Sequence, residues 1–282
     1  MDKQQSAFLS AGIAHVVIIF FGILMIYPVA WLFFASFTED AAIFSDTRLI
    51  PRNWIMSNYV EGWRGLGFVT FGTFFANSFM LAGLSVLLNV IFCSLTAYAF
   101  ARLNFPGRKI WFAIMLITMM LPGQVTTIPR YVIFVNFGWL DTQLPMLVPR
   151  LFAQEAFFIF LLVQFIRGIP KELDESAHID GYGKLGIYLR IIIPLSVPAL
   201  VTTMLFSFLW SWDDFFNQLL YLVSPRNLTV PLGLRMFVEA DGIASWGAMF
   251  AMSVLSLVPS FILFFTLQKY FVQGISTTGI KG

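Results

Sequence analysis

Long apolar runs separated by short polar segments make up most of this sequence. A helix needs about 20 apolar residues to cross the hydrocarbon core of a bilayer. Runs of that length recur from one end of the chain to the other, and no polar stretch between them is long enough for a soluble domain. The pattern predicts one all-α membrane domain over residues 1–282, with six transmembrane helices at about 13–34, 75–99, 110–132, 147–165, 197–219 and 247–267.

The third of these runs contains a helix-breaking element near its middle. Leu121-Pro122-Gly123-Gln124 is followed by Thr127 and Pro129. Proline removes a backbone hydrogen bond and clashes with the preceding turn, so we expect the helix to kink or partly unwind there. Irregular backbone inside a membrane is tolerated only against protein or a water-filled cavity. Two interpretations stay open: a kink that serves packing, and a bend that lines a pathway.

Composition and charge support a membrane protein and exclude nucleic acid as a partner. Hydrophobic residues make up 59% of the chain and charged residues only 11%, whereas a soluble domain carries roughly a quarter charged residues. The formal charge of +2 is too small to suggest nucleic acid. If the N-terminus lies in the cytoplasm, every lysine falls on the inner side, as the positive-inside rule favours. We therefore expect both termini in the cytoplasm.

Much of the charge lies in residues 168–194, between the fourth and fifth apolar runs. Pro170 suits the first position of a helix, and Glu172 and Asp174 would place negative charge at the positive end of its dipole. Gly181 suits a left-handed cap at the other end. A second helix is expected to start near Lys184 and to lead into the next span. This is the only inner segment long enough to present a defined surface to a partner.

One face of the first of these two helices carries small and apolar residues. Leu173, Ser176 and Ala177 are spaced i, i+3 and i+4, which places them on one stripe of a helix. Small residues on such a stripe would let another surface approach closely. The other interpretation is an ordinary charged loop between two membrane helices.

Polar residues also cluster at the outer end of the fifth run. In a continuous helix, Asp213 and Asn217 share one face. Acidic residues at membrane depth usually face a polar cavity, and Glu155 in the fourth run falls under the same rule. Anchoring at the membrane interface explains Trp210 and Trp212 adequately. The candidate residues of a translocation pathway are Gln124, Thr127, Glu155, Trp212, Asp213, Asp214 and Asn217.

Signatures of enzymes and of metal sites are absent from the sequence. There is no His-Glu-x-x-His and no Gly-x-Ser-x-Gly, and the two histidines, His15 and His178, lie far apart. The single cysteine, Cys93, excludes an internal disulfide and a cysteine-based metal site. Leu185 follows Lys184 where a phosphate-binding loop needs Ser or Thr. We expect no bound metal or cofactor, no catalytic residue and no ATP hydrolysis by this chain.

The spacing within residues 168–194 resembles the EAA loop of ABC-importer permeases. Glu175-Ser-Ala is followed by Gly181, Ile191 and Pro194, with Ser176 and Ile193 in place of the usual Ala and Leu. The resemblance implies the type I ABC-importer fold and a cytoplasmic coupling helix that contacts an ATPase. The residues that it places in this coupling loop are Glu172, Asp174, Glu175, Ala177, Asp180, Gly181, Ile191 and Pro194.

The rest of the chain is similar to the maltose-type carbohydrate permeases, and specifically to their smaller, second permease subunit. The similar segments are Leu49-Ile-Pro51, Asn58-Tyr59, Asn77-Ser78, Met120-Leu-Pro122, Gly138-Trp-Leu-Asp-Thr142, Phe157 to Phe165, Trp212-Asp-Asp-Phe215 and the tail Gln268 to Gly282. The family implies a second permease subunit, two cytoplasmic ATPase subunits that hold ATP and Mg²⁺, and an extracytoplasmic binding protein. It also implies a bacterial cell (inner) membrane location and a C-terminus, with Gln273, Gly274 and Lys281, that faces the ATPases.

Three functions from different classes are therefore compared. The first is the permease subunit of an ATP-driven importer for an oligosaccharide or a glycoside. The second is an ion-coupled secondary transporter, which would be expected to show two internal halves with interrupted helices, whereas one such helix is visible. The third is an intramembrane enzyme, which the missing catalytic motifs disfavour. A requirement of uptake for a separate ATPase would separate the first two.

Overall fold

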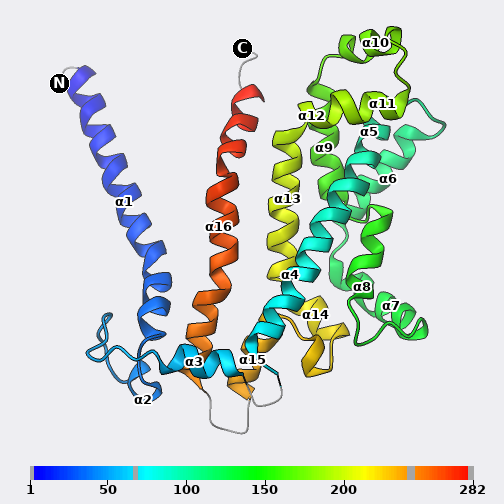
Figure 1. Cartoon of the computed structure of the whole chain (residues 1–282). Helices are drawn as coiled ribbons and strands as arrows, with labels where there is room; N and C mark the ends of the chain where they lie inside the picture. Colours follow the sequence, from blue (N-terminus) through cyan, green and yellow to red (C-terminus); the bar gives the residue numbers. More distant parts are fainter. Residues whose placement is uncertain (1–2, 66–68, 240–244, 279–282) are drawn as a thin grey trace. The chain divides into compact units, whose positions relative to one another are not determined.

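The computed structural model describes residues 3–65, 69–239 and 245–278, and all regular elements in these ranges are helices (Figure 1). This confirms the predicted all-α fold class. The chain divides into two compact units. One comprises Met1–Phe71 and Leu234–Val258, and the other comprises Gly72–Gly233 and Pro259–Gly282.

The first unit contains α1 (Lys3–Ala35), α2 (Asp40–Ile43), α3 (Ser57–Arg64) and the first part of α16 (Trp246–Thr278). Helix α1 is apolar along residues 12–35, and none of the most apolar part of it is buried in the protein. A helix that is apolar on all sides needs lipid or another protein around it. This helix therefore has the properties of a membrane span.

Polar side chains hold the connection between α1 and α3 in place. The Asn58 side-chain amide donates to the carbonyls of Ser36 and Thr38, at 2.9 Å each. The hydroxyls of Ser36 and Tyr59 share a hydrogen bond of 2.8 Å. At the start of α16, the backbone N–H of Gly247 donates to Asp40 at 2.6 Å. The polar and aromatic loop after the first span is therefore an ordered cap where the structure describes it.

The second unit contains the remaining helices, except that residues 234–239 of α15 belong to the first unit, and it also includes α16 from Pro259 onward. In chain order they are α4 (Phe71–Leu88), a π-helical turn (Asn89–Cys93), α5 (Ser94–Arg102), α6 (Arg108–Met120), α7 (Gly123–Asn136), α8 (Leu144–Leu147), a 3₁₀ turn (Val148–Phe152), α9 (Ala156–Gly168), α10 (Glu172–Ile179), α11 (Lys184–Ile187), a second π-helical turn (Tyr188–Ile192), α12 (Ile193–Leu195), α13 (Val197–Trp212), α14 (Phe215–Tyr221), a 3₁₀ turn (Pro225–Asn227) and α15 (Val230–Glu239). Within this unit, α10 and α11 lie at one end, whereas α7, α8 and α14 lie at the other (Figure 1).

Among the residues that the structure describes, four helical stretches are long and apolar enough to cross a membrane, and two bent pairs bring the number to six if each pair is one span. The straight stretches are 12–35, 71–102, 144–168 and 246–270. The pair α6 and α7 bends by 100°, and the pair of 184–195 and α13 bends by 79°. The six spans expected from the sequence therefore require both bent pairs to count.

The expected third and fifth spans differ from the observed helices. The third was expected as one kinked helix over 110–132, but α6 ends at Met120 and the chain turns sharply at Pro122, which precedes α7. The fifth was expected to run to Leu219, but α13 ends at Trp212. In both places a residue that favours a helix start, Pro122 or Asp214, ends one helix and begins another.

The main core of the second unit surrounds α9. Phe158, Leu162 and Ile166 are almost completely buried, and their helix, α9, packs against α5 and the first π-helical turn. A separate row of polar contacts joins α4 to α13. Ser85 and Ser211 share a hydrogen bond of 3.1 Å, and Asn89 donates to the Ser207 hydroxyl at 2.8 Å. Such bonds between membrane helices average about 0.6 kcal/mol each, so they set register more than they add stability.

Asn77 and Ser78 form hydrogen bonds with the backbone of residues 226–230. The Asn77 amide donates to the carbonyls of Arg226 and Leu228, at 2.8 Å each. The Ser78 hydroxyl accepts from the backbone N–H of Val230 at 2.9 Å. Both side chains are thus used to fix the end of α4 to the segment before α15.

Asp141 ties the loop after α7 to the loop after α14. It has a left-handed φ of 58°, and its carboxylate accepts from the backbone N–H groups of Val223 and Ser224, at 2.9 and 2.8 Å. The Ser224 hydroxyl donates to the same carboxylate at 2.5 Å. Burial by itself would raise the pKa of Asp141, but these bonds and one from Asn227 outweigh it and lower the pKa to about 2.

Candidate functional site

The coupling segment, residues 168–194, folds as two short helices joined by a tight turn. Gly181 has a φ of +87°, as its predicted role as a left-handed cap requires. Its N–H donates to the His178 carbonyl, and the Tyr182 N–H reaches the Ala177 carbonyl at 3.0 Å, which is the Schellman pattern. Helix α11 begins at Lys184, as predicted. The first helix, however, begins at Glu172 rather than at Pro170, and Lys171 is its N-cap.

The charged residues of α10 divide into two groups. Glu172, Glu175 and Asp180 are exposed. Asp174 instead points back to the protein, where Arg102 lies 3.0 Å from its carboxylate. Burial raises the pKa of the Asp174 carboxyl above its ordinary value, and the charge of Arg102 opposes that rise. The exposed acids are free for a partner, whereas Asp174 is used internally.

The small-residue stripe predicted on α10 is wrong in one respect. Ala177 is only 4% exposed and belongs to the same core cluster of its own chain as Tyr98 and Ile187. Leu173 is 41% exposed and Ser176 is exposed, so only these two are available to another surface. Ile191, in the second π-helical turn, is half-buried, and Pro194, in α12, is exposed. The spacing alone did not indicate which residues of the stripe would be buried in the core.

The predicted tail falls at the limit of the structure. Gln273 and Gly274 belong to α16, but their side chains lie outside the described residues. Lys281 lies outside the described residues altogether. Their role near an ATPase therefore stays a prediction.

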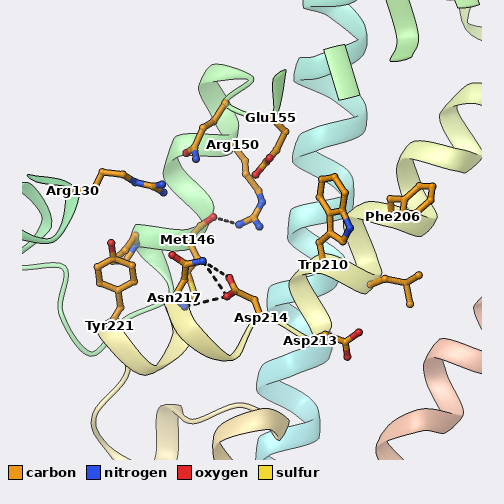
Figure 2. Close-up of a pocket in the computed structure, with 13 residues that line it drawn as sticks. Arg130, Met146, Arg150, Glu155, Phe206, Trp210, Asp213, Asp214, Asn217 and Tyr221 are labelled. Carbon is orange, nitrogen blue, oxygen red and sulfur yellow. Dashed lines mark hydrogen bonds between the residues drawn. The ribbon is translucent and has the colours of Figure 1, made fainter. Parts of the chain in front are cut away.

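A polar pocket of about 630 Å³ lies at the other end of the second unit from α10 (Figures 1 and 2). This volume is within the range of ~300–1,000 Å³ that is usual for small-molecule sites. The walls come from α7, α8 with the turn that follows it, α13 and α14. The lining residues are Arg130, Pro145, Met146, Arg150, Gln154, Glu155, Phe206, Leu209, Trp210, Asp213, Asp214, Asn217 and Tyr221.

Irregular backbone places the charged residues of one wall. The 3₁₀ turn after α8 ends at Ala153, whose φ of 51° is left-handed, and Glu155 follows just before α9 begins. Figure 2 shows the guanidinium of Arg150 between the carboxylates of Glu155 and Asp214 in this view. Arg150 also donates to the Met146 carbonyl. Non-helical backbone that lines a cavity is the form in which a membrane protein tolerates it.

The break between α13 and α14 forms the opposite wall. Asp214 caps α14 by accepting the backbone N–H of Asn217 at 3.1 Å, and the Asn217 side-chain amide donates to the same carboxylate at 3.0 and 2.9 Å. The predicted pairing of Asp213 with Asn217 on one helix face is therefore wrong, because the helix does not continue. Asp213, Asp214 and Asn217 still line the pocket together.

Three other predicted pathway residues lie elsewhere. Trp212 is 2% exposed, and its ring stacks on Phe208 with centroids 5.3 Å apart. Gln124 is exposed on α7, and the Thr127 hydroxyl donates to the Gly123 carbonyl at 3.2 Å. None of the three lines the pocket. Their assignment to this site is not supported.

The prediction missed the aromatic and cationic parts of the pocket. Trp210 was read as an interfacial anchor, but it lines the pocket and its ring stacks on Phe158 with centroids 5.0 Å apart. Arg130 and Arg150 come from segments that are distant in sequence from α13, so only the fold brings them to Asp213 and Asp214. In the part of the chain that the structure describes, no three His, Cys, Asp or Glu side chains are placed to hold a metal ion.

Comparison with known proteins decides the family. Residues 89–277, which include both the coupling segment and the pocket residues, match the model of the binding-protein-dependent transport system inner membrane component. This chain is a member of that family. It is thus a permease of the ABC-transporter type, a transport component.

Relatives of this permease include named sugar transporters. It is 33% identical to the trehalose/maltose transport system permease protein MalG of Thermococcus litoralis, over 94% of each chain. It is 30% identical to the arabinooligosaccharides transport system permease protein AraQ of Halalkalibacterium halodurans, over 93% of this chain and 94% of that one. In fold it is similar to a chain of a bacterial ABC transporter involved in the import of the acidic polysaccharide alginate, with a TM-score of 0.83 and 24% identity, over 96% of this chain and 99% of that one.

Proposed function

We propose that this permease carries a neutral carbohydrate, an oligosaccharide or a glycoside, into the cell through a pathway that includes the polar pocket. The observation that carries the proposal is the combination of aromatic and hydrogen-bonding side chains in one pocket of a binding-protein-dependent permease. The relatives named for trehalose, maltose and arabinooligosaccharides support a sugar as the substrate class.

The pocket has the chemistry that a sugar needs. The C–H face of a pyranose ring is apolar and packs on an aromatic ring, which Trp210, Phe206 and Tyr221 provide. Sugar hydroxyls donate to carboxylates and accept from guanidinium and amide groups, which Asp213, Arg130 and Asn217 among others present. One cavity therefore presents both hydrogen-bond donors and acceptors beside aromatic rings.

The charges of the pocket favour a neutral sugar over an acidic one. Its carboxylates are Glu155, Asp213 and Asp214, against the two guanidiniums of Arg130 and Arg150. Arg150 already faces Glu155 and Asp214 (Figure 2). A uronate would therefore bring further negative charge to a site that is not positive overall, and like charges in a poorly solvated site repel strongly.

The proposed assembly contains a second, homologous permease subunit, two cytoplasmic ATPase subunits that hold ATP and Mg²⁺, and an extracytoplasmic binding protein. In this arrangement α10 and both termini face the cytoplasm of a bacterial cell, and the pocket lies toward the outside. The exposed acids Glu172, Glu175 and Asp180 of α10 suit a basic ATPase surface. The Gln273, Gly274 and Lys281 tail would approach the same subunits.

Reconstitution in proteoliposomes tests the transport mechanism. The permease, its partner subunits and the binding protein are expected to take up a labelled neutral oligosaccharide only with ATP present and with active ATPase subunits. Excess unlabelled neutral oligosaccharide should compete, and an oligosaccharide of uronates should not. Uptake driven by an ion gradient without ATPase subunits would instead favour a secondary transporter.

Substitution of Trp210 tests the pocket itself. Trp210→Ala removes an aromatic face and is expected to reduce uptake about tenfold, which corresponds to ~1.4 kcal/mol, while Trp210→Phe should retain most of it. Trp111→Ala is the matched control, because Trp111 is 59% exposed on α6 and lies outside the pocket. Equal uptake by the Trp210→Ala and Trp111→Ala variants would remove the pocket from the pathway.

A further inference from the structure

Three polar side chains follow one face of α5 at intervals of four residues. Ser94, Tyr98 and Arg102 are i, i+4 and i+8, and we call them the α5 polar row. Each makes a polar contact with the segment that contains the coupling helix. The hydroxyls of Ser94 and Tyr188 share a hydrogen bond of 2.7 Å, and the Tyr98 hydroxyl donates to the Lys184 carbonyl at 2.9 Å.

Arg102 completes the row at the end of the span. Its Nη2 donates to the Ile169 carbonyl at 2.7 Å, and its Nε lies 3.0 Å from a carboxylate oxygen of Asp174. The Arg102 side chain is 4% exposed and that of Asp174 is 18% exposed. An ion pair so little exposed to water is screened weakly, and removal of one partner leaves the other charge buried and unpaired.

The contacts of the row bracket α10 on both sides. Ile169 precedes α10, and Asp174 lies in its first turn. Lys184 and Tyr188 follow the Gly181 turn. Between them, Ala177 packs into the same core as Tyr98, whose ring lies 5.3 Å from that of Tyr188 between centroids. The start, the middle and the end of the coupling segment are therefore all fixed to one helix.

We propose that Ser94, Tyr98 and Arg102 are positioning residues that make the coupling segment and the span 71–102 one rigid piece, so that movement of α10 moves this span. The inference rests on the proposed function, in which α10 contacts an ATPase subunit. A force on α10 can change the pathway only through contacts that persist as the protein moves, and the row supplies a contiguous set of such contacts. Its loss would leave the ATPases bound but poorly connected to transport.

The test measures ATP molecules hydrolysed per sugar imported, in proteoliposomes of the complete transporter. Arg102→Gln is expected to raise this ratio about tenfold, within the range typical of coupling between sites, with the ATPase subunits still co-purifying. Arg102→Lys keeps the charge near Asp174 and should raise the ratio less. Lys109→Gln is the matched control, because it removes an exposed cation at the same end of the protein.

A smaller change keeps the proposal falsifiable if the Arg102→Gln variant does not fold. Tyr98→Phe removes only the hydroxyl bonded to Lys184 and retains the ring packing, and it should raise the ratio in the same direction by a smaller factor. An unchanged ratio in these variants, with uptake and hydrolysis falling in step, would show a purely structural role and overturn the inference. Absence of ATP-dependent uptake by the unsubstituted transporter would instead refute the proposed function.

Discussion

Gly181 ends α10 with a backbone conformation that other residues adopt only at a cost. Its φ is +87°, and open space surrounds the position where a Cβ would lie. A substitution there is consequently disfavoured by the backbone and not by a neighbouring side chain. The left-handed region costs an L-residue roughly 1–2 kcal/mol, more for a β-branched one. The direction of α10 relative to the chain that follows it depends on this left-handed conformation of Gly181.

Gly181→Val is expected to reorient α10 and to abolish most sugar uptake, with reduced co-purification of the ATPase subunits. The permease should still insert and pair with its partner permease, because the turn lies outside the spans. Gly183→Ala is the control, since Gly183 has a φ of −75° and also has open space around it. Normal uptake and normal ATPase recruitment by the Gly181→Val variant would contradict the role of this turn in coupling.

Gly247 shows the opposite case, in which space and not φ is limiting. A methyl group at this position would collide with the side-chain amide of Asn58, which donates hydrogen bonds to the carbonyls of Ser36 and Thr38. Gly247→Ala is therefore expected to lower the free energy of unfolding of the detergent-solubilised protein by ~1–3 kcal/mol. Gly83→Ala in α4 has open space and serves as the control. Similar thermal unfolding of both variants would contradict the packing described for Asn58.

At this scale the sequence predicted conformations better than it predicted partners. Gly181 is the cap that its spacing indicated, because a left-handed turn is a local property of the chain. Asp213 and Asn217 do not pair, because Asp214 caps a new helix that a continuous 3.6-residue repeat cannot foresee. Glu155 lines the pocket just after the left-handed Ala153, and alanine gives no signal for that conformation.

At the scale of elements, the two bent helix pairs depart most from the pattern of apolar runs. Pro122 was a reason to expect a kink, but a bend of 100° separates α6 and α7 into two short helices. Helix α6 has 13 residues and would be about 20 Å long, less than the ~30 Å thickness of the hydrocarbon core. The hydropathy pattern predicts how many apolar residues the two helices contain together. It does not predict the angle between them.

The loop connection made by Asp141 provides a prediction with a defined pH range. Its pKa falls from 3.8 to about 2, so the folded state favours the ionised carboxylate. The stabilisation from this group is therefore present above about pH 4 and is lost as the pH falls from there toward 2. The melting temperature of the wild type should exceed that of the Asp141→Asn variant by a constant margin at pH 5–7 and by a shrinking margin below about pH 4.

Asp46→Asn provides the comparison for this measurement. Asp46 is an acidic residue of the loop that follows the first span, and its ion pair with Arg48 is long, at 4.0 Å, and exposed. Exposed pairs of this kind contribute about 0–1 kcal/mol, so its variant should track the wild type at every pH. A margin for Asp141→Asn that does not depend on pH would show that the carboxylate charge is unimportant in the loop connection.

At the scale of the whole molecule, the orientation in the membrane is the main prediction. All lysines fall on one side if the termini are cytoplasmic. A reporter enzyme that is active only outside the cytoplasmic membrane should therefore be silent when it is fused after Gly282. The same reporter inserted after Arg52, in the polar loop that follows the first span, should be active. Activity of the fusion after Gly282 would overturn the proposed topology.

The fold class could be predicted from the sequence because a helix that crosses a membrane needs about 20 apolar residues. Every long apolar run shows this requirement directly. The turn at Gly181 and the helix start at Lys184 were likewise predictable, since both are local features. The pocket and the α5 polar row required tertiary information. Ser94, Tyr98 and Arg102 have regular spacing, but nothing in the sequence identifies Tyr188, Lys184 and Asp174 as their partners.

The π-helical turn Asn89–Cys93 has a consequence for the rotational phase of the span 71–102. An α-helix turns by about 100° per residue, and a π-helical turn absorbs one extra residue without that rotation. Ser85 and Asn89, which bond to α13, are thereby brought into one gently drifting stripe with Ser94 and Tyr98. Deletion of a single residue within 89–93 would let the helix become regular and leave that stripe intact, whereas insertion of one would turn its two halves apart by about 100°. The number of residues in this one turn therefore sets the angle between the contacts that the span makes with α13 and those that it makes with Lys184 and Tyr188.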